Sequence, residues 1–426
     1  MQALKTELES RGLLYQTSSD NLFKKFDEGN GKFYCGFDPT ADSLHLGNFI
    51  GFMVAIHMMR RGNTYIALTG GATGMIGDPG GKDAERSFLS VEALDNNQKK
   101  IQSQMETILG NIATFTGDDF SYESVNNKDF YTDMGYLDFL REIGKYITVN
   151  VMMGKDTVKK RIEDPAKSIS YTEFSYMLLQ GYDFCHLFKQ KDVTLQIGGQ
   201  DQWGNLVTGT ELIRKKYDAD TGVMTWPLIT DASGKKFGKS EGNALWLDPE
   251  KTTPYELYQY FMNTADADIE RYMKMLTLIE VDEIHKIVMD HLKVPEERKG
   301  QKMLAFGVVE IIHGTVQAEL AEKITEFMFG NEDKIETLNN LDTDSLRTFQ
   351  KAMGGVQYEQ QSLFELIVQS GLANSNSEAR NALQSGAISI NQAKISDPKY
   401  DFSSDFIGKG TLLLQKGKKN LRIITK

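Results

Sequence analysis

Two short segments, far apart in the chain, combine residue types that hold phosphate groups. The first, PTADSLHLGN at 39–48, lies between a predicted strand and a predicted helix. His45 and Asn48 therefore lie beside free N–H groups at the positive end of the helix dipole. Thr40, His45 and Asn48 can donate hydrogen bonds to phosphate oxygens, and Gly47 lets a flat base approach the backbone. The simpler alternative is an ordinary capped helix.

The second segment, KFGKS at 236–240, places Lys236 and Lys239 in a glycine-containing turn, followed by Ser240. Mobile cations suit a negative charge that develops only in a transition state. Taken alone, this segment is also typical of an exposed basic turn. The two segments together, in this order, predict a site that acts on a nucleotide.

Two common nucleotide-binding motifs are excluded by their spacing. The glycine-rich segment Gly70–Gly77 follows a predicted strand but does not fit the G-x-G-x-x-G pattern of dinucleotide-binding folds. The segment GKKFGKS at 234–240 has three residues between its glycines, where a P-loop has four. Neither a dinucleotide fingerprint nor a Walker A loop is predicted.

The elements around the first segment form a strand, helix, strand unit, which requires a parallel sheet. A further strand and helix follow, so the expected fold class is α/β, with a doubly wound, Rossmann-like catalytic domain up to about residue 225. Apolar spacings of three and four predict helices over 254–329, and the apolar-poor stretch after them predicts a linker. The expected elements are strands at 32–38, 64–69 and 193–197, and helices at 48–61 and 201–216.

Composition and charge restrict the class of protein. The chain has 426 residues, a net charge of −11 and two cysteines, which excludes a disulfide scaffold and a four-cysteine zinc site. No apolar run reaches the ~18 residues of a membrane span, and the N-terminus does not resemble a targeting signal. We expect a cytoplasmic protein. Residues 358–426 carry nine basic and six acidic residues, which predicts a polyanion-binding tail or, alternatively, a solubilising one.

One predicted helix presents three polar side chains on the same face. Ser170 and Glu173 have the spacing of a capping box that begins a helix. Tyr176, Gln180 and Asp183 then follow at i, i+4 and i+7. Such an alignment is usually a solvated stripe, and a ligand-binding face is the alternative.

HLGN and KFGKS resemble the HIGH and KMSKS motifs of class I aminoacyl-tRNA synthetases. The longer runs YCGFDPTADSLHLGN, GGATGMIGDP, EFSYMLLQGYDF and LQIGGQDQWGN are similar to bacterial tyrosyl-tRNA synthetases. The resemblance covers essentially the whole chain, with Asn48 in place of the second histidine of HIGH and Phe237-Gly238 in place of Met-Ser. It implies activation of L-tyrosine with ATP to tyrosyl-adenylate and pyrophosphate, followed by transfer of tyrosine to the 3′ end of tRNA(Tyr).

The resemblance also implies roles for individual residues. Asp183 and Tyr34 would bind the phenolic hydroxyl, while Tyr176, Gln180 and Asp78 would hold the α-ammonium of tyrosine. Mg²⁺ would accompany the ATP phosphates without a dedicated protein site, so no metal ligand is expected. The full expected sets are, for catalysis, Thr40, His45, Asn48, Lys236, Lys239, Ser240, Lys82 and Arg86; for tyrosine, Tyr34, Asp78, Tyr176, Gln180, Asp183 and Gln202; and for ATP, Cys35, Gly36, Asp38, Gly47, Gly199, Asp201 and Lys239.

The tail resembles the S4 RNA-binding fold. Helices are predicted over 362–370 and 375–385, followed by a strand at 387–391 that turns back through Asn391-Gln392, where the family usually has Asn-Gly. The residues expected at tRNA phosphates are Arg380, Lys394, Lys416, Lys418 and Lys419.

The resemblance gives an expected domain order and expected partners. The order is a catalytic domain at 1–225, a domain with the KFGKS loop and helices at 226–330, a linker at 331–357 and the S4-like domain at 358–426. An insertion at about 116–167 implies a homodimer, and neither a membrane nor DNA is expected as a partner. Three alternatives are a tryptophanyl-tRNA synthetase, a small-molecule nucleotidyltransferase and a non-catalytic RNA-binding paralogue. Tyr34 and Asp183 favour a phenol over an indole, and the lysine motif and the tail disfavour the nucleotidyltransferase. The non-catalytic paralogue is disfavoured by intact Lys236, Lys239, His45 and Asp183.

Overall fold

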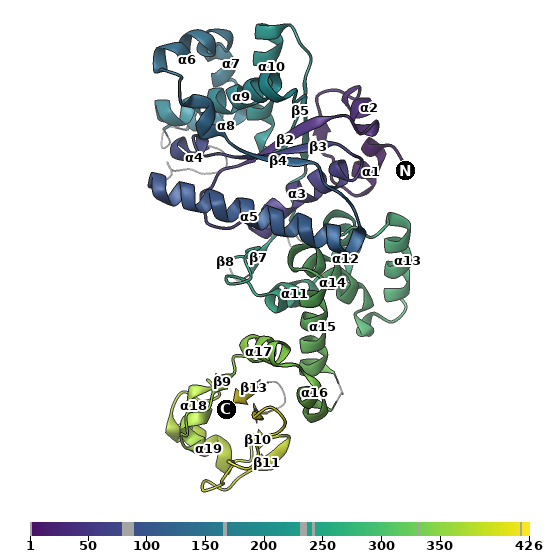
Figure 1. The fold of residues 1–426 in the computed structure, drawn as a ribbon, viewed down its shortest axis with the longest axis vertical. Coiled ribbons are helices and arrows are strands. Elements are labelled where there is room, and N and C mark those ends of the chain that lie inside the picture. Colours follow the sequence, from purple (N-terminus) through teal and green to yellow (C-terminus); the bar gives the residue numbers. More distant parts are fainter. Residues whose placement is uncertain are drawn as a thin grey trace. The chain divides into compact units, whose positions relative to one another are not determined.

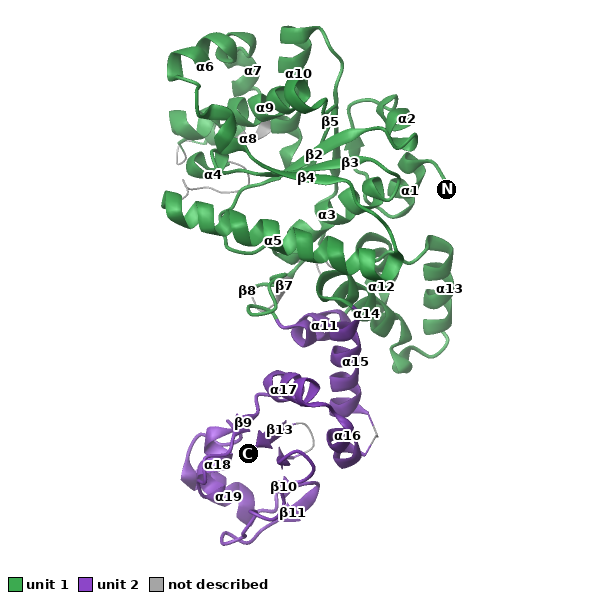
Figure 2. Cartoon of the chain, in the orientation of Figure 1, with its two compact units in different colours: residues 1–252, 263–314 green, residues 253–262, 315–426 purple. Residues whose placement is uncertain are grey.

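The structure is a computed structural model, and it describes residues 2–78, 89–164, 168–230, 237–240, 243–330, 333–417 and 420–426 (Figure 1). The chain forms two compact units, drawn in different colours in Figure 2. Unit 1 comprises residues 1–252 and 263–314, and unit 2 comprises residues 253–262 and 315–426. In the described part of the chain no helix is long and apolar enough to cross a membrane.

A six-stranded sheet forms the centre of unit 1, in the order β1-β6-β5-β2-β3-β4. Every neighbouring pair is parallel except β1 with β6. The apolar and aromatic runs KFYCGF and TYIALT form the two central strands, as the sequence predicts, because both sides of these strands are buried. The strands are β1 (Gln16–Thr17), β2 (Lys32–Phe37), β3 (Thr64–Thr69), β4 (Tyr122–Asn126), β5 (Leu195–Gly199) and β6 (Gly222–Trp226).

The strand order reverses between β2 and β5. From β2 the chain continues to β3 and β4 on one side, whereas β5 and β6 lie on the other side. In open parallel sheets a ligand binds at such a switch point, beyond the carboxyl ends of the strands. The sheet therefore places the ends of β2 and β5 where a site is expected, as predicted from the strand, helix, strand pattern.

Helices lie on both sides of this sheet, with α9 and α10 on one side and α3 and α5 on the other (Figure 1). The capping box predicted at Ser170 is present, since its hydroxyl accepts from Glu173 N–H and the Glu173 carboxylate accepts from Ser170 N–H. The helices of the sheet region are α1 (Leu4–Ser10), α2 (Leu22–Asp27), α3 (Leu46–Met59), α4 (Thr73–Ile76), α5 (Val91–Thr116), α6 (Tyr136–Glu142), α7 (Val149–Met153), α8 (Asp156–Ile162), α9 (Tyr171–Lys191) and α10 (Trp203–Tyr217), with 3-10 turns η1 (Asn127–Tyr131), η2 (Gly144–Tyr146) and η3 (Gln200–Gln202).

The domain boundaries predicted near 225 and 330 are not those of the two units. Helices α12 (Asp266–Leu276) and α14 (Lys299–His313) contact α3 and α5 within unit 1, and the Asn111 side chain donates to the Ile312 carbonyl oxygen at 2.9 Å. Helix α11 (Pro254–Met262) instead contacts α15 (Thr315–Phe329) in unit 2. Local periodicity predicts these helices but not which neighbour each one packs against. Unit 1 also contains α13 (Val281–His291), η4 (Pro295–Glu297), β7 (Lys239–Ser240) and β8 (Asn243–Ala244).

The predicted linker at 331–357 is wrong as a structural assignment. It contains two helices, α16 (Lys334–Asn340) and α17 (Thr343–Ala352), and the strand β9 (Val356–Gln357). Leu346, Phe349 and Met353 are buried against Leu413 and Ile423 of the tail sheet. A few apolar residues at helical spacing are enough for this packing, although the average composition of the segment is polar.

The tail has the helices and strands that the sequence predicts. Its sheet has the order β11-β10-β12-β13-β9. Asn391 and Gln392 both have positive φ, 45° and 69°, so the turn keeps the backbone that Asn-Gly usually adopts. The elements are α18 (Leu363–Gln369), α19 (Asn376–Gln384), β10 (Ile388–Ile390), β11 (Ala393–Ile395), β12 (Thr411–Lys416) and β13 (Asn420–Thr425).

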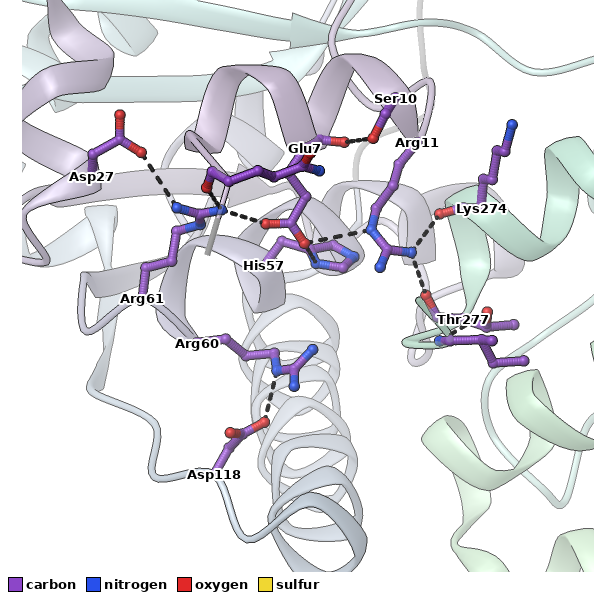
Figure 3. Close-up of polar contacts among 12 residues, drawn as sticks. Glu7, Ser10, Arg11, Asp27, His57, Arg60, Arg61, Asp118, Lys274 and Thr277 are labelled. Carbon is purple, nitrogen blue, oxygen red and sulfur yellow. Dashed lines mark hydrogen bonds and ion pairs between the residues drawn. The ribbon is translucent and has the colours of Figure 1, made fainter. Parts of the chain in front are cut away.

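A buried cluster of charges joins α1 to the end of α3 in unit 1. Figure 3 shows the Glu7 carboxylate between His57, Arg11 and Arg61. Glu7 oxygens lie 3.1 Å from His57 Nδ1 and 2.6 Å from Arg61 Nη2. Burial lowers the pKa of His57 to about 4 despite its hydrogen bond to Glu7. His57 is therefore neutral at pH 7, and it holds α3 to α1 through Glu7.

Candidate active site

A cavity of about 620 Å³ opens at the carboxyl edge of the sheet in unit 1, at the switch point between β2 and β5. This volume suits a small-molecule substrate. The residues predicted from the sequence that line this cavity are Tyr34, Cys35, Gly36, Asp38, Thr40, His45, Gly47, Asn48, Asp78, Tyr176, Gln180, Asp183, Gly199, Asp201 and Gln202. The fold therefore brings together residues from β2, the start of α3, α9 and the end of β5.

The most buried wall of the cavity carries a phenol and a carboxyl. The Tyr34 hydroxyl is buried and has no hydrogen-bond partner among the described residues. Asp183 is 2% exposed and accepts from Asn127 Nδ2 and the Tyr131 hydroxyl, both at 2.9 Å. Burial raises the pKa of Asp183 to about 8 against these two hydrogen bonds. This wall can satisfy one additional hydroxyl group that both donates and accepts.

A second group of polar side chains surrounds Asp38 at the end of β2. Its two carboxylate oxygens accept from the Tyr176 hydroxyl at 2.9 Å and the Thr73 hydroxyl at 2.6 Å. Gly70 is required here, because a Cβ on it would lie 2.1 Å from Asp38 Oδ1. The Gln180 Oε1 atom has no partner in the described part of the chain. An acceptor and a nearby carboxylate suit a cationic group of a ligand.

Asp78 faces the same cavity from the end of the glycine-rich loop. Gln202 Nε2 donates to its Oδ2 at 2.8 Å, and Asn205 Nδ2 approaches Oδ1 at 3.4 Å. Gln202 therefore orients the Asp78 carboxylate, in addition to lining the cavity itself. These contacts add a second carboxylate to the part of the cavity that suits a cation.

The HLGN segment begins α3 with an unusual capping box. His45 Nδ1 accepts from Asn48 N–H at 3.2 Å, and Asn48 Oδ1 accepts from His45 N–H at 3.1 Å. Because Nδ1 accepts, the neutral ring carries its proton on Nε2 and can donate from there. Asn48 thus fixes the orientation of His45, which explains how an amide serves at this position.

The described part of the KFGKS segment lies directly against the HLGN segment. A Cβ built on Gly238, whose φ is +78°, would lie 3.1 Å from Leu46 Cβ and 3.3 Å from Gly47 N. Leu245 N–H donates to the Gly238 carbonyl oxygen, and Leu46 N–H donates to the Leu245 carbonyl oxygen. The two segments predicted from the sequence to act together are therefore neighbours in the fold.

Several predicted site residues cannot be placed in this cavity. Lys82, Arg86, Lys236, Lys418 and Lys419 lie outside the described residues. Lys239 and Ser240 are described only as the backbone of strand β7, which pairs with β8.

The described basic residues of the tail differ in their surroundings. Arg380 and Lys394 are exposed, as a contact to a polyanion requires. Lys416 instead donates at 2.8 Å to both the Leu372 carbonyl oxygen and Glu378 Oε1. Hydrogen bonds from Lys416 and the Asn374 backbone lower the pKa of Glu378 to about 2. Lys416 is thus paired within the tail, and its contact with a tRNA phosphate stays a prediction.

Sequence reasoning missed the residues that support this cavity from behind. Asn127 Nδ2 donates to both Asp183 and the Thr73 hydroxyl, linking the two groups of polar side chains. Asn127 follows β4, whose carboxyl end lies at the ligand-binding edge of the sheet. The pair Asn126-Asn127 at the end of a strand could have indicated these residues. The strand itself was not predicted, because the polar run YESVN lacks the apolar pattern of a strand. Trp246, which also lines the cavity, carried no sequence signal.

The described lining of the cavity is suited to binding and polarising a ligand. Burial raises the pKa of the Cys35 thiol to about 12, so its thiolate is scarce at neutral pH. No group of three or more His, Cys, Asp or Glu that could hold a metal ion occurs among the described residues. What remains is a carboxyl–phenol wall, carboxylates for a cation and a helix start suited to an anion.

Known proteins match this chain over both units. Residues 27–330 match the family described as tRNA synthetases class I (W and Y), and residues 346–424 match the tyrosine--tRNA ligase SYY-like C-terminal domain. A tyrosine--tRNA ligase of Streptococcus pneumoniae (strain Hungary19A-6) is 45% identical over 424 residues, 98% of this chain and 99% of the relative. One from Streptococcus mutans is 45% identical over 421 residues, with the same two coverages.

A solved structure agrees with these sequence matches. The C-terminally truncated mitochondrial tyrosyl-tRNA synthetase of Aspergillus nidulans has a TM-score of 0.71 and 31% identity, and the match covers 77% of this chain and 95% of that one. The doubly wound parallel sheet followed by helices and a separate C-terminal domain is the fold of this family. The chain therefore belongs to the class I aminoacyl-tRNA synthetases, as a member of the tyrosine–tRNA ligase family.

Proposed function

We propose that the cavity activates L-tyrosine with ATP and that the chain then transfers tyrosine to the 3′ end of tRNA(Tyr). The observation that carries this proposal is the buried wall formed by Tyr34 and Asp183. A substrate phenol there donates to Asp183 and accepts from the otherwise unpartnered Tyr34 hydroxyl. Phenylalanine would leave the buried Tyr34 hydroxyl without a partner and would give Asp183 no additional donor, and one unsatisfied buried group costs about 1–3 kcal/mol.

The rest of the amino acid lies toward the carboxylates. Gln180 Oε1 and the carboxylate of Asp78 accept from the α-ammonium, and the Tyr176 hydroxyl acts with them. Asp38 is held by Tyr176 and Thr73, which leaves it close to both the ammonium and the adenylate. This arrangement directs the tyrosine carboxylate toward the start of α3.

Adenylate formation needs positioning and charge stabilisation rather than a general base. An oxygen of the ionised tyrosine carboxylate attacks the α-phosphorus of ATP and forms an O–P bond. The bond between the α-phosphorus and the oxygen that bridges it to the β-phosphorus breaks, and that oxygen leaves as part of pyrophosphate. Thr40, His45 and the helix start donate to the phosphates, and Lys239 stabilises the leaving charge. Lys236, Lys82, Arg86 and Ser240 are proposed to assist on the pyrophosphate side. Mg²⁺ would be held by the ATP phosphates themselves.

The second step uses the same cavity. Gly36, Gly47, Gly199, Asp201 and Cys35 line it where the adenosine would lie. A terminal hydroxyl of tRNA attacks the carbonyl carbon of tyrosyl-adenylate, forming the ester and releasing AMP. The exposed Arg380 and Lys394 are proposed to contact tRNA phosphates, with Lys418 and Lys419 of the same tail.

A tryptophanyl-tRNA synthetase is disfavoured by both the site and the relatives. An indole has an N–H donor but no acceptor to satisfy Tyr34, and the residues 346–424 match a tyrosine-type domain.

The proposed homodimer is supported by exposed apolar side chains within the expected insertion at about 116–167. Leu137 is 77% exposed and Val149 57% exposed, and neighbouring tyrosines are similarly uncovered. A gathering of large exposed apolar side chains in one segment is typical of an interface. We expect Leu137→Glu to convert a dimer to monomers in sedimentation experiments, whereas Leu292→Glu, at an exposed position on another helix end, leaves the dimer intact. Equal masses for both variants and the wild type would refute this surface.

The decisive experiment is ATP–pyrophosphate exchange with each amino acid in turn. We expect exchange with tyrosine only. Lys239→Ala should depress the exchange rate by at least about tenfold, about 1.4 kcal/mol of transition-state stabilisation, with tyrosine affinity nearly unchanged. Lys293→Ala, a surface change on the ion pair with Asp290, is the control. Exchange with tryptophan would reject the tyrosine assignment, and a Lys239→Ala rate within threefold of wild type would reject the role of Lys239.

A further inference from the structure

A short antiparallel pairing connects the loop before α3 to the segment after the KFGKS hairpin. Leu46 N–H donates to the Leu245 carbonyl oxygen at 2.8 Å, and Leu247 N–H donates to the Leu44 carbonyl oxygen at 2.9 Å. Between them, His45 and Trp246 form an isolated β-bridge, with their ring centroids 6.2 Å apart. His45 is thus held directly opposite a residue that follows β8, the partner strand of β7, in which Lys239 lies.

An ion triad lies beside this pairing and joins the same two segments. Asp42, three residues before His45, is contacted by Lys251 Nζ and by Lys100 Nζ, the latter at 2.9 Å. Lys251 also places its ammonium 4.9 Å from the centre of the Trp246 ring. Hydrogen bonds from Lys251 and Lys100 lower the pKa of Asp42 to about 2. The carboxylate is therefore ionised throughout the neutral range.

The loop is held from the α5 side as well. Gln104 Oε1 accepts from Leu44 N–H at 2.9 Å, and Gln104 Nε2 donates to the Ser43 hydroxyl oxygen at 3.2 Å. Gln104 and Lys100 thus fix the loop to α5, whereas the contact between Asp42 and Lys251 links it to the segment after β8. The backbone pairing itself consists of two hydrogen bonds. A side-chain contact beside it can therefore contribute a large share of the energy that fixes the register of the two segments.

We propose that Asp42 and Lys251 are positioning residues for adenylate formation, acting by holding the strand that follows the lysine hairpin in register with His45. Neither side chain is required to touch a substrate, although Lys251 lies over the ring of the cavity-lining Trp246. The inference rests on the roles proposed above for His45 and Lys239. Breaking the pair lets the 244–247 segment shift along Leu44–Leu46, which moves the hairpin away from the phosphates bound at α3 while leaving the tyrosine end, on α9 and β2, unaffected.

The experiment measures pyrophosphate exchange for Asp42→Asn and Lys251→Met in the full chain. Methionine keeps an apolar chain on the Trp246 ring without the charge. We expect kcat to fall about five- to tenfold, since a displacement of order 1 Å of a catalytic group costs up to about 100-fold. We expect the KM for ATP to rise and the KM for tyrosine to stay within twofold. The double variant should be no worse than either single one, because both remove the same contact.

Asp290→Asn is the matched control. Asp290 also joins two lysines, Lys293 and Lys299, in unit 1, but on α13. This variant should match wild type in kcat and both KM values. The three tryptophans of the chain, Trp203, Trp226 and Trp246, all lie in unit 1, so urea unfolding followed by their fluorescence reports whether a variant is merely less stable. Asp42→Glu should restore at least half of the lost kcat.

The outcomes separate this inference from the proposed function. If Lys239→Ala abolishes exchange but Asp42→Asn and Lys251→Met leave kcat unchanged, the positioning role is wrong and the proposed function stands. If Lys239→Ala itself leaves exchange unchanged, the role on which the inference depends fails first. If Asp42→Asn raises both KM values equally, or lowers kcat only in parallel with a loss of folded protein, the pair is structural and the inference is overturned.

Discussion

At the scale of single residues, Asp183 combines two opposing requirements. The side chain must be buried to recognise a phenol without competition from water, yet burial favours its neutral form and raises its pKa to about 8. Asn127 and Tyr131 donate to its two oxygens and partly offset that effect. Since these two donors and Tyr34 surround Asp183, the phenol of the substrate is best bound as a donor to an ionised carboxylate.

This arrangement predicts that tyrosine binding depends on pH. Below pH 8 the free protein must release the Asp183 proton before the phenol can donate, so affinity should fall by about tenfold between pH 8 and pH 6.5. Calorimetric titration with tyrosine measures it. The affinity of Asp183→Asn for tyrosine should be lower than that of wild type at pH 8 by on the order of tenfold. It should not change between pH 8 and pH 6.5. A pH-independent affinity in the wild type would mean that the protonated carboxyl binds the phenol.

The sequence was sufficient to predict which polar side chains share one face of α9, but not which residues of other elements support them. Tyr176, Gln180 and Asp183 follow from helical spacing after a capping box that the structure contains. Asn127 and Tyr131 come from a 3-10 turn after an edge strand, and neither polar strands nor short turns have a strong periodic signature. Local patterns predict side chains on one element, whereas contacts between elements need the tertiary structure.

At the scale of elements, α3 is fixed at both ends by polar contacts. His45 and Asn48 cap its start, and near its end His57 and Arg61 bind Glu7 of α1 (Figure 3). Although burial favours the neutral acid, hydrogen bonds from His57 and Arg61 hold the pKa of Glu7 well below its usual range. Because α3 begins at the cavity, this distal cluster contributes to the rigidity of the phosphate end.

The cluster predicts a specific acid sensitivity. The pKa of His57 is about 4 when folded and about 6.5 when unfolded, so the unfolded chain binds more protons between these values. Stability then falls as the pH is lowered from 6.5 to 4, by up to about 3 kcal/mol from this residue. Glu7 adds to the loss below its unfolded pKa of about 4.3, whereas Asp183 acts in the opposite direction.

His57→Gln isolates the contribution of the histidine. Glutamine can still donate to Glu7 but does not titrate, so the free energy of unfolding of the variant should decline less than that of wild type between pH 6.5 and pH 4. Urea unfolding followed by tryptophan fluorescence measures this difference at several pH values. The exposed His285 provides the control, since His285→Gln should parallel wild type. Parallel curves for His57→Gln and wild type would show that His57 is not held neutral.

Elements also show where composition misleads. The stretch 331–357 is polar on average, which predicts a linker, yet Leu346, Phe349 and Met353 cover one side of the tail sheet. A truncation at Gly355 would therefore remove the whole tail sheet, including β9, and leave the apolar residues of α15 and α17 that pack against it uncovered. Substitutions at exposed basic residues test the function of the tail more cleanly than a truncation does.

At the scale of the whole molecule, positive charge is concentrated in the C-terminal tail. The chain has a net charge of −11, but its last 69 residues, 358–426, carry more basic than acidic side chains. The structure divides these cations into two groups. Arg380 and Lys394 are exposed, whereas Lys416 is bound to Glu378 and a backbone carbonyl oxygen. Of these three residues, we therefore expect Arg380 and Lys394 to neutralise phosphates more readily than Lys416 does.

This division predicts how tRNA binding responds to salt. Each cation that neutralises a phosphate adds about 0.7–0.9 to the slope of the logarithm of affinity against that of salt concentration. Replacing Arg380 and Lys394 with alanine should weaken tRNA binding and lower the slope by about 1.5, with tyrosine-dependent pyrophosphate exchange unchanged. Lys416→Met should keep the wild-type slope but unfold the tail at lower urea, because Glu378 loses its partner. Filter binding between 50 and 200 mM salt measures both slopes. If Lys416→Met lowers the slope and the double variant does not, then Lys416 contacts a phosphate and Arg380 and Lys394 do not.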